Sequence, residues 1–157
     1  MSTPHERVID YLTDAGIPFE VIEHPPAASA EEYSRVVGSQ LSQQAKALLL
    51  RRYKREGGKD LIIHALPGDA RGDLGELAGP LQAKRLRLAS VAELEAATGC
   101  HFGELPSIGS IFDLPLSVDA RLLEQDRVFF NAGRLDRSVV VNLNEVSRIE
   151  APIVVGA

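Results

Sequence analysis

The stretch QQAKALLLRR, residues 43–52, places one lysine, Lys46, directly before four consecutive apolar residues and returns to charge at Arg51 and Arg52. A short apolar run bounded by polar residues predicts a buried strand or a buried helix segment, and periodicity alone does not separate the two. Lys46 would lie at the end of this core element, where its ammonium group can bind a phosphate or orient a substrate oxygen. The alternative is a solvated lysine at a strand end, because charged side chains are seldom buried.

The composition predicts one soluble globular domain spanning residues 1–157. Of the 157 residues, 45% are hydrophobic and 25% are charged, and this length suits a single domain with a sizeable core. No apolar segment approaches the roughly 18 residues that a membrane span needs. The N-terminal segment MSTPHERVIDYL lacks the apolar region of a signal peptide. A single cysteine, Cys100, allows no internal disulfide, so we expect a cytoplasmic protein with no membrane contact.

Charge is unevenly distributed along the chain. The net charge of −5 disfavours sequence-independent binding to nucleic acid and therefore argues against DNA as a partner. Basic side chains nevertheless gather in residues 51–59 and in residues 84–87. These two stretches are either a local surface for a polyanion or solvated loops, and the sequence leaves both interpretations open.

Capping patterns and apolar periodicity predict interleaved helices and strands. Ser, Thr, Asp or Asn followed three residues later by Glu recurs along the chain and marks helix starts, and glycines mark several helix ends. Apolar runs between turn residues predict the strands. We expect helices over residues 3–16, 29–38, 73–79, 90–98 and from 142 onward, and strands over residues 19–24, 45–53, 61–66, 85–88, 128–131, 138–143 and 152–155.

Two features of this pattern bear on the sheet. The strands at 45–53 and 61–66 are joined by a short Gly-containing turn, so they are expected to pair antiparallel, and other connections are too short for crossovers. A mixed sheet follows. Residues 111–118 are expected to be extended with an edge or a bend at Pro115, and residues 119–124 to form one helical turn.

Several familiar kinds of active site are missing from the sequence. It contains no GxGxxG or GxxxxGK[ST] pattern for a nucleotide phosphate and no GxSxG nucleophile elbow. The four histidines lack the spacing of a metal site, so we expect neither metal nor cofactor. Cys100 follows a predicted helix C-terminus, where the helix dipole raises a thiol pKa, so a small buried residue is expected there rather than a nucleophile.

What remains is Lys46 and two glycine-containing loops. The first is CHFGELPSIG at residues 100–109, and the second contains Asn131, Ala132 and Gly133. Such loops can turn backbone N–H groups toward an anionic or carbonyl oxygen and so stabilise developing charge. The alternative for each is an ordinary surface turn.

Four segments in matching order resemble the YbaK/prolyl-tRNA synthetase-associated editing domain family: QQAKALLLRR, LPGDARGDLGELA, KRLRLASVAELEAATGCHFGELPSIG and VFFNAGRLDRSVVVN. The resemblance extends over residues 11–149. It implies a compact α/β domain with a mixed, strongly curved, barrel-like sheet surrounded by helices. It also implies a free-standing enzyme that hydrolyses the ester between a wrong amino acid and the 3′ end of a tRNA, above all tRNA for proline carrying alanine, serine, cysteine or a similar small residue. Aminoacyl-tRNA would be the partner, with prolyl-tRNA synthetase as a second candidate.

The resemblance further implies roles for individual residues. Lys46 would hold the terminal phosphate or ribose, residues 103–109 would present backbone amides to the aminoacyl group, and water would attack with help from the ribose hydroxyl. Asp136 resembles an aspartate that some members use, and a turn aspartate is its alternative. The expected catalytic residues are Lys46, Gly103 and Asp136; the expected substrate-binding residues are His24, Leu105, Pro106, Ser107, Ile108, Gly109, Asn131, Ala132 and Gly133; and the expected tRNA-binding residues are Arg51, Arg52, Lys84 and Arg85.

The amino acid that is removed stays open at the level of sequence. The family's loop often reads Gly-x-x-x-Pro, whereas here Pro106 lies one position earlier. We expect a pocket lined by residues such as Leu48, Ile63 or Ile108, which would admit a small side chain and exclude the cognate one by size. The alternative function is a non-catalytic tRNA-binding or synthetase-binding module with the same fold.

Overall fold

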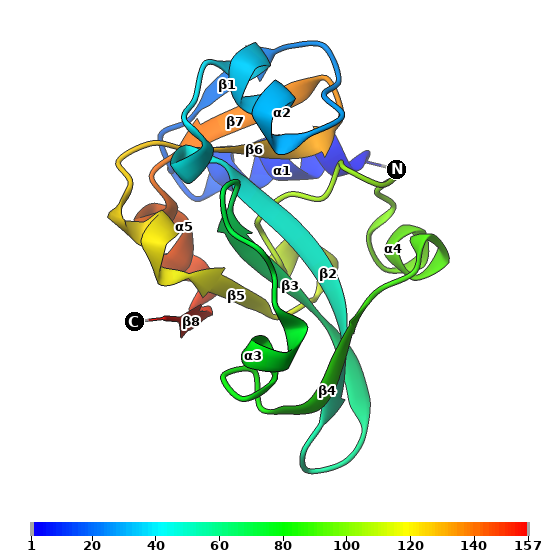
Figure 1. Ribbon diagram of the computed structural model, residues 1–157. Coiled ribbons are helices and arrows are strands. Elements are labelled where there is room, and N and C mark those ends of the chain that lie inside the picture. The colour runs from blue at the N-terminus through cyan, green and yellow to red at the C-terminus, as the bar shows by residue number, and fades with distance from the viewer. Residues whose placement is uncertain (1, 157) are drawn as a thin grey trace.

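The computed structural model describes residues 2–156 and contains helices and strands in alternation (Figure 1). The helices are α1 (Pro4–Asp14), α2 (Ala30–Val37), α3 (Leu74–Ala78), α4 (Val91–Thr98) and α5 (Leu143–Glu150), with 3₁₀ turns η1 (Leu41–Gln43), η2 (Ser110–Phe112) and η3 (Ala120–Glu124). The strands are β1 (Glu20–Glu23), β2 (Ala45–Lys54), β3 (Lys59–Pro67), β4 (Ala83–Leu88), β5 (Leu116–Asp119), β6 (Val128–Arg134), β7 (Arg137–Val141) and β8 (Ile153–Val155).

The described strands divide between two sheets. One is antiparallel with the order β1-β7-β6, and the other has the order β4-β2-β3-β5-β8. In the larger sheet β2 pairs antiparallel with β3 and β4, whereas β5 pairs parallel with β3 and β8, so the expected mixed sheet is confirmed. The expected barrel-like closure is not confirmed, because among residues 2–156 the two sheets are linked by one isolated bridge, between Gln44 and Phe129.

The expected helix starts are present, because their determinants lie within one turn. The side chains of Thr3, Ser29, Asp73 and Ser90 each accept a hydrogen bond from the backbone N–H three residues on, and Asn142 accepts one from two residues on. Left-handed glycines follow α2 and α4. None of the helices within residues 2–156 is long and apolar enough to cross a membrane.

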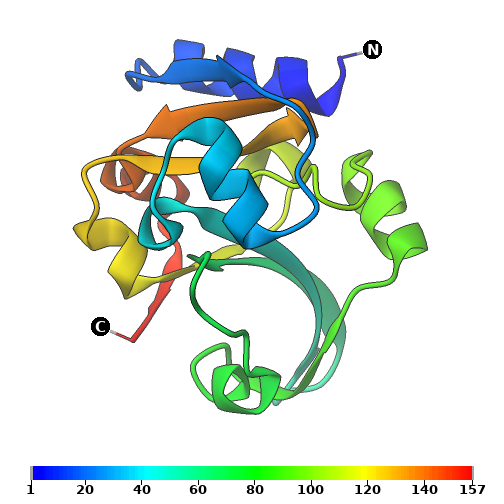
Figure 2. The same cartoon turned by 45° about the horizontal axis from the view of Figure 1, so that its top comes forward.

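The central strand β2 has a continuous apolar run because both of its faces are covered. Leu49 belongs to the main core, which also contains Val8 and Leu12 of α1. Leu50 faces the other way, into a smaller core that includes Leu77 of α3. Strands buried on both faces lose the usual alternation of polar and apolar residues. Figure 2 shows β2 and β3 curving around the side on which α3 lies.

Two expectations about strand boundaries are wrong. Residues 111–118 do not begin extended, since η2 comes first, although the expected interruption at Pro115 is present and strand β5 begins directly after it. This strand lies between β3 and β8 rather than at an edge, and Pro115 contributes only its carbonyl, which accepts the N–H of Ile63 at 3.0 Å. Residues 131–133 are not a loop but the irregular end of β6, where the pairing with β7 shifts between Asn131 and Arg134.

Candidate functional site

One cavity of about 430 Å³ opens where the two sheets meet. Its walls come from the segment before α2, from the start of β2, from the end of β4, from the loop after α4 and from the β6–β7 hairpin. The lining residues are Ala27, Ala28, Ser29, Ala30, Tyr33, Gln44, Ala45, Lys46, Ala47, Leu48, Leu49, Leu88, Ala89, Leu94, Phe102, Gly103, Leu105, Asn131 and Leu135. A mostly apolar concavity with a few polar groups is the usual form of a small-molecule site.

Lys46 lies in the wall of this cavity. It is the second residue of β2, opposite Leu66 of β3, and its side chain is half-buried. The ammonium group donates a hydrogen bond to the carbonyl oxygen of Ala70 at 2.9 Å. An ammonium group has three N–H donors, and this bond uses one of them. Lys46 is thus anchored to the loop after β3 and can still donate to a molecule in the cavity.

The loop after α4 contributes only its first half to the cavity. Gly103, which has φ +89°, and Leu105 line it, whereas the residues from Pro106 to Gly109 are buried elsewhere. Ile108 is fully buried in the main core. Gly109 donates its N–H to Glu150 at 2.8 Å, and an added Cβ there would lie 2.3 Å from the carbonyl oxygen of Leu114. The second half of the loop therefore has a packing role.

The expected pocket lining needs the same correction. Leu48 lines the cavity, but Ile63 and Ile108 are fully buried in the main core and do not. Ser107 is also fully buried, and its hydroxyl has no hydrogen-bond partner. Ile63 is paired with Leu49 and shares its sheet face, yet only Leu49 reaches the cavity. Which core residues the cavity exposes therefore depends on the segments packed over each position, and the sequence alone did not decide this.

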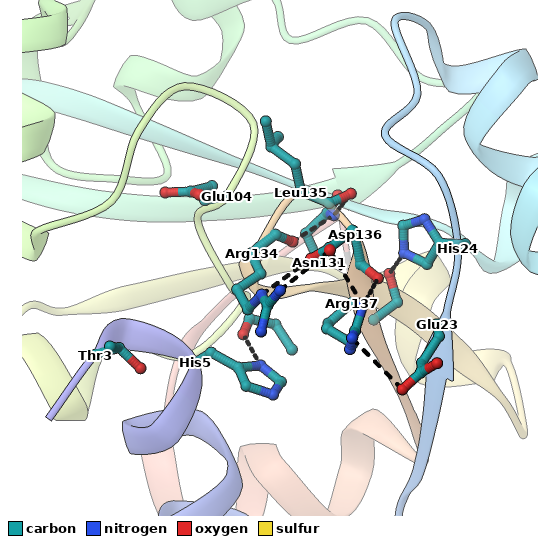
Figure 3. A network of polar contacts seen from close by, with 12 residues as sticks. Thr3, His5, Glu23, His24, Glu104, Asn131, Arg134, Leu135, Asp136 and Arg137 are labelled. Carbon is teal, nitrogen blue, oxygen red and sulfur yellow. Dashed lines mark hydrogen bonds and ion pairs between the residues drawn. The ribbon is translucent and has the colours of Figure 1, made fainter.

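Only one of the three residues Asn131, Ala132 and Gly133 faces the cavity. Asn131 lines it and donates through Nδ2 to the carbonyl of Arg134 at 3.0 Å, which ties the hairpin together (Figure 3). Ala132 is fully buried, and its carbonyl accepts a hydrogen bond from Nδ1 of His5 at 2.7 Å. Gly133 packs directly on the backbone of Pro4 and His5 at the start of α1.

Asp136 and His24 lie behind the cavity wall rather than in it. Asp136 sits in the hairpin turn and pairs with Arg134 at 2.9 Å and Arg137 at 3.2 Å (Figure 3). The hydrogen bond from Arg134 lowers the pKa of its carboxyl, so the geometry is that of a turn aspartate. His24 is buried, and its Nε2 meets the hydroxyl of Ser138 at 2.7 Å.

The site contains residues that the sequence did not single out. The hydroxyl of Tyr33 lies 2.6 Å from Ser138 Oγ, which links this cavity-lining residue to His24. Burial raises the pKa of the Tyr33 hydroxyl. Gln44 also lines the cavity, and its buried Oε1 has no hydrogen-bond partner. Tyr33 lies outside the four segments that carry the family resemblance, whereas Gln44 belongs to the stretch QQAKALLLRR, directly before the first residue of β2.

The basic residues expected to bind tRNA fall into two groups. Arg51 pairs with Glu93 at 2.7 Å, and Arg52 pairs with Asp60 at 2.7 Å. Both are therefore held by carboxylates within the fold. Lys84 and Arg85 on β4 are exposed, and the guanidinium of Arg85 lies 4.2 Å from the ring centre of Tyr53.

Two further observations concern other chemistries. Within residues 2–156, no group of three or more His, Cys, Asp or Glu side chains is arranged to hold a metal ion. Cys100 is fully buried, and burial raises the pKa of its thiol to about 11. The thiol is therefore protonated at neutral pH, which is the opposite of what a nucleophilic cysteine requires.

Comparison with known proteins gives consistent matches. The family model of the aminoacyl-tRNA editing domain matches residues 24–149. The multifunctional Ser/Thr-tRNA deacylase ProXp-y of Escherichia coli K12 is 36% identical over 152 residues, which cover 96% of this chain and 90% of the relative. ProXp-y of Escherichia coli O157:H7 matches with the same identity and coverage.

Solved structures extend the comparison to the fold. A crystal structure described as a candidate trans-editing enzyme for prolyl-tRNA synthetase has a TM-score of 0.81 at 25% identity, covering 98% of this chain and 96% of that chain. The hypothetical protein APE2540 has a TM-score of 0.79 at 24% identity, with 95% and 97% covered, and shows the same fold. The resemblance noted in the sequence is therefore confirmed: the chain belongs to the aminoacyl-tRNA editing domain family, and its enzyme class is that of an aminoacyl-tRNA deacylase.

Proposed function

We propose that this protein is a free-standing cytoplasmic editing enzyme that removes a small, wrongly attached amino acid from the 3′ end of a tRNA. The observation that carries the proposal is Lys46, an ammonium group in the wall of an otherwise mainly apolar cavity within the region that matches the editing family. The cavity volume of about 430 Å³ falls within the usual range of small-molecule sites. It leaves room for a small aminoacyl group together with part of the ribose.

The identity of the amino acid is a finer part of the proposal. ProXp-y, at 36% identity, is named a Ser/Thr-tRNA deacylase, so serine and threonine are our first candidates. Alanine and cysteine on tRNA for proline come next, because a solved relative at 25% identity is described as an editing enzyme for prolyl-tRNA synthetase. The cavity offers polar groups that a hydroxyl could meet, among them the ammonium of Lys46 and the amide of Asn131.

The chemistry assigned to the residues is electrostatic. Water attacks the ester carbonyl, a bond forms between the water oxygen and the carbonyl carbon, and the bond to the ribose oxygen breaks. The proton lost by the water ends on that ribose oxygen, passing through the neighbouring ribose hydroxyl. Lys46 and the backbone near Gly103 supply donors for the charge that develops on the carbonyl oxygen. Asp136 positions the hairpin that carries Asn131, since its carboxylate is held by Arg134 and Arg137.

The acceptor end would approach over the exposed basic residues of β4. Lys84 and Arg85 are exposed there, and Leu88 at the end of the same strand lines the cavity. Arg51 and Arg52 support this surface indirectly through their ion pairs. Prolyl-tRNA synthetase remains a candidate partner that could deliver the tRNA.

The test is deacylation of tRNAs carrying serine, threonine, alanine, cysteine or proline by wild type, Lys46→Ala and Lys84→Ala. Removing one oxyanion donor costs about 100- to 1,000-fold in kcat, so Lys46→Ala is expected to lose hydrolysis of every accepted amino acid. Lys84→Ala is the charge-matched control. It is expected to raise KM and to weaken the dependence of KM on salt concentration, with kcat retained. Bound tRNA without hydrolysis by the wild type would favour the non-catalytic binding module instead.

A further inference from the structure

Three apolar side chains at the cavity are unusually exposed. Phe102 is 81% exposed, Leu88 57% and Leu135 38%, and all three line the cavity. They come from three separate segments: the loop after α4, the end of β4 and the β6–β7 hairpin. We call this cluster of Phe102, Leu88 and Leu135 the apolar rim. Exposed apolar side chains that gather beside a cavity mark a binding surface, whereas isolated ones need no explanation.

The chain around the apolar rim is held by hydrogen bonds. The turn that carries Phe102 is closed at both ends, since His101 donates its N–H to the Glu104 carboxylate at 2.6 Å and Glu104 donates its N–H to the His101 carbonyl at 3.0 Å. Leu135 lies against this turn, because a Cβ added to Gly103 would be 3.0 Å from Leu135 Cδ2. Figure 3 shows Leu135 beside Asn131 in the hairpin.

The third member of the rim is held in the same way. The carbonyl of Leu88 accepts a hydrogen bond from Arg87 at 3.2 Å, and Arg87 is in turn paired with Glu93 at 2.7 Å. The backbone of the turn that carries Phe102 is therefore pinned, and Leu88 and Leu135 lie on further hydrogen-bonded segments that line the same cavity. A preorganised aromatic surface of this kind loses little conformational freedom when a flat partner covers it.

The proposed function determines what must lie at this place. When the aminoacyl group enters the cavity toward Lys46, the ester joins it to the ribose of the terminal nucleotide, and the base of that nucleotide must then lie beside the cavity. Unpaired bases are commonly recognised by stacking on aromatic side chains. The apolar rim consists of one phenyl ring and two aliphatic side chains, which suit the face of a neutral base better than a phosphate.

We propose that the apolar rim is the platform on which the 3′-terminal adenine of the tRNA stacks, with Phe102 as the stacking residue. The proposal rests on the proposed function, because it places the ester in the cavity. It assigns Phe102 to binding of the nucleoside and not to the hydrolysis step. Stacking of one base contributes about 1–3 kcal/mol, which corresponds to roughly 5- to 150-fold in affinity.

The first test uses the absence of tryptophan from the sequence. The Phe102→Trp variant carries a single tryptophan at the apolar rim, and its fluorescence reports stacking directly. The probe is 3′-seryl-amino-3′-deoxyadenosine, whose amide bond resists hydrolysis, with adenosine and the corresponding cytidine compound as comparisons. The matched control is Val154→Trp, since Val154 on β8 is 39% exposed and does not line the cavity. We expect quenching by the adenosine compounds in Phe102→Trp only.

The second test is kinetic. Phe102→Ala is expected to raise KM for seryl-tRNA by about 5- to 150-fold with kcat largely retained, and Phe102→Trp is expected to restore KM. An unchanged KM in Phe102→Ala, or a fall confined to kcat, would overturn the assignment. So would a fluorescence response of Phe102→Trp to prolyl-tRNA synthetase but not to the adenosine probe, since the apolar rim would then be a protein-docking surface.

The two levels of the proposal fail separately. If the wild type hydrolyses no aminoacyl-tRNA while the probe still quenches the Phe102→Trp variant, the proposed deacylase function is wrong and the nucleoside platform stands. If the wild type hydrolyses seryl-tRNA and neither fluorescence nor KM responds at Phe102, the function stands and the platform is refuted.

Discussion

Replacing Gly133 with alanine is expected to destabilise the protein strongly, although the change adds one methyl group on a strand. Gly133 has φ +77°, and an added Cβ would lie 2.6 Å from the backbone nitrogen of His5 and 2.7 Å from the carbonyl carbon of Pro4. The left-handed conformation costs a residue with a Cβ roughly 1–2 kcal/mol, and forcing extra volume into a packed contact costs about 1–3 kcal/mol.

The hydrogen bond between His5 Nδ1 and the Ala132 carbonyl, 2.7 Å long, would be strained when α1 moves away. Its loss would cost a further ~0.5–1.5 kcal/mol. The free energy of unfolding should therefore fall by roughly 2.5–6.5 kcal/mol in total. For a chain of this length each kcal/mol lowers Tm by about 2–4 °C.

The assay is urea and thermal denaturation followed by circular dichroism, with Gly38→Ala as the matched control. Gly38 has nearly the same dihedral angle, φ +78°, but nothing lies within 4 Å of its added Cβ. In this control the free energy of unfolding should fall only by the cost of the left-handed conformation, about 1–2 kcal/mol. An equal fall in the free energy of unfolding in the two variants would refute the reasoning, because it would show that α1 moves away from the added methyl group at no energetic cost.

Two further predictions concern ion pairing and the cavity wall. Hydrogen bonds from Arg87, from the Ser90 backbone and from Arg51 lower the Glu93 carboxyl pKa. The contribution of Glu93 to stability is therefore present above the unfolded pKa of about 4.3 and is lost progressively as the pH falls below it. In urea melts, the free energy of unfolding should fall less between pH 7 and pH 3 in Glu93→Gln than in wild type. An equal fall in the two proteins would contradict this prediction. Gln44→Met is expected to leave the protein as stable or to raise its free energy of unfolding by about 1–2 kcal/mol, because the buried Oε1 of Gln44 lacks a partner. A marked fall in Tm in thermal melts would count against this prediction.

Much of the local structure was predictable from the sequence because its determinants are close together in the chain. The capping pair Thr3 and Glu6 marks the start of α1, and Ser90 and Glu93 mark that of α4, each within one helical turn. The hairpin of β2 and β3 follows from two apolar runs and a glycine-containing turn. The expected position of Lys46 at the end of a core strand followed from the same local pattern, and its place beside a cavity agrees with it.

The family resemblance was also accessible from sequence, since four segments kept their order over most of the chain. It correctly indicated the editing domain family. It did not indicate which loop residues reach the cavity. Leu105 lines the cavity while Ile108, three residues later, is fully buried in the core, and a motif read along the chain contains nothing that separates the two.

The sequence by itself thus determined the helix caps, the β2–β3 hairpin, the lysine at the start of β2 and the family. The tertiary structure alone decided the division into two sheets, the contact of Gly133 with α1, the ion pair of Arg51 with Glu93 and the meeting of Phe102, Leu88 and Leu135 at the cavity. The physical reason is the separation along the chain of the residues that interact. Caps and turns depend on hydrogen bonds between residues a few positions apart, whereas these tertiary contacts depend on how segments far apart in the chain pack together.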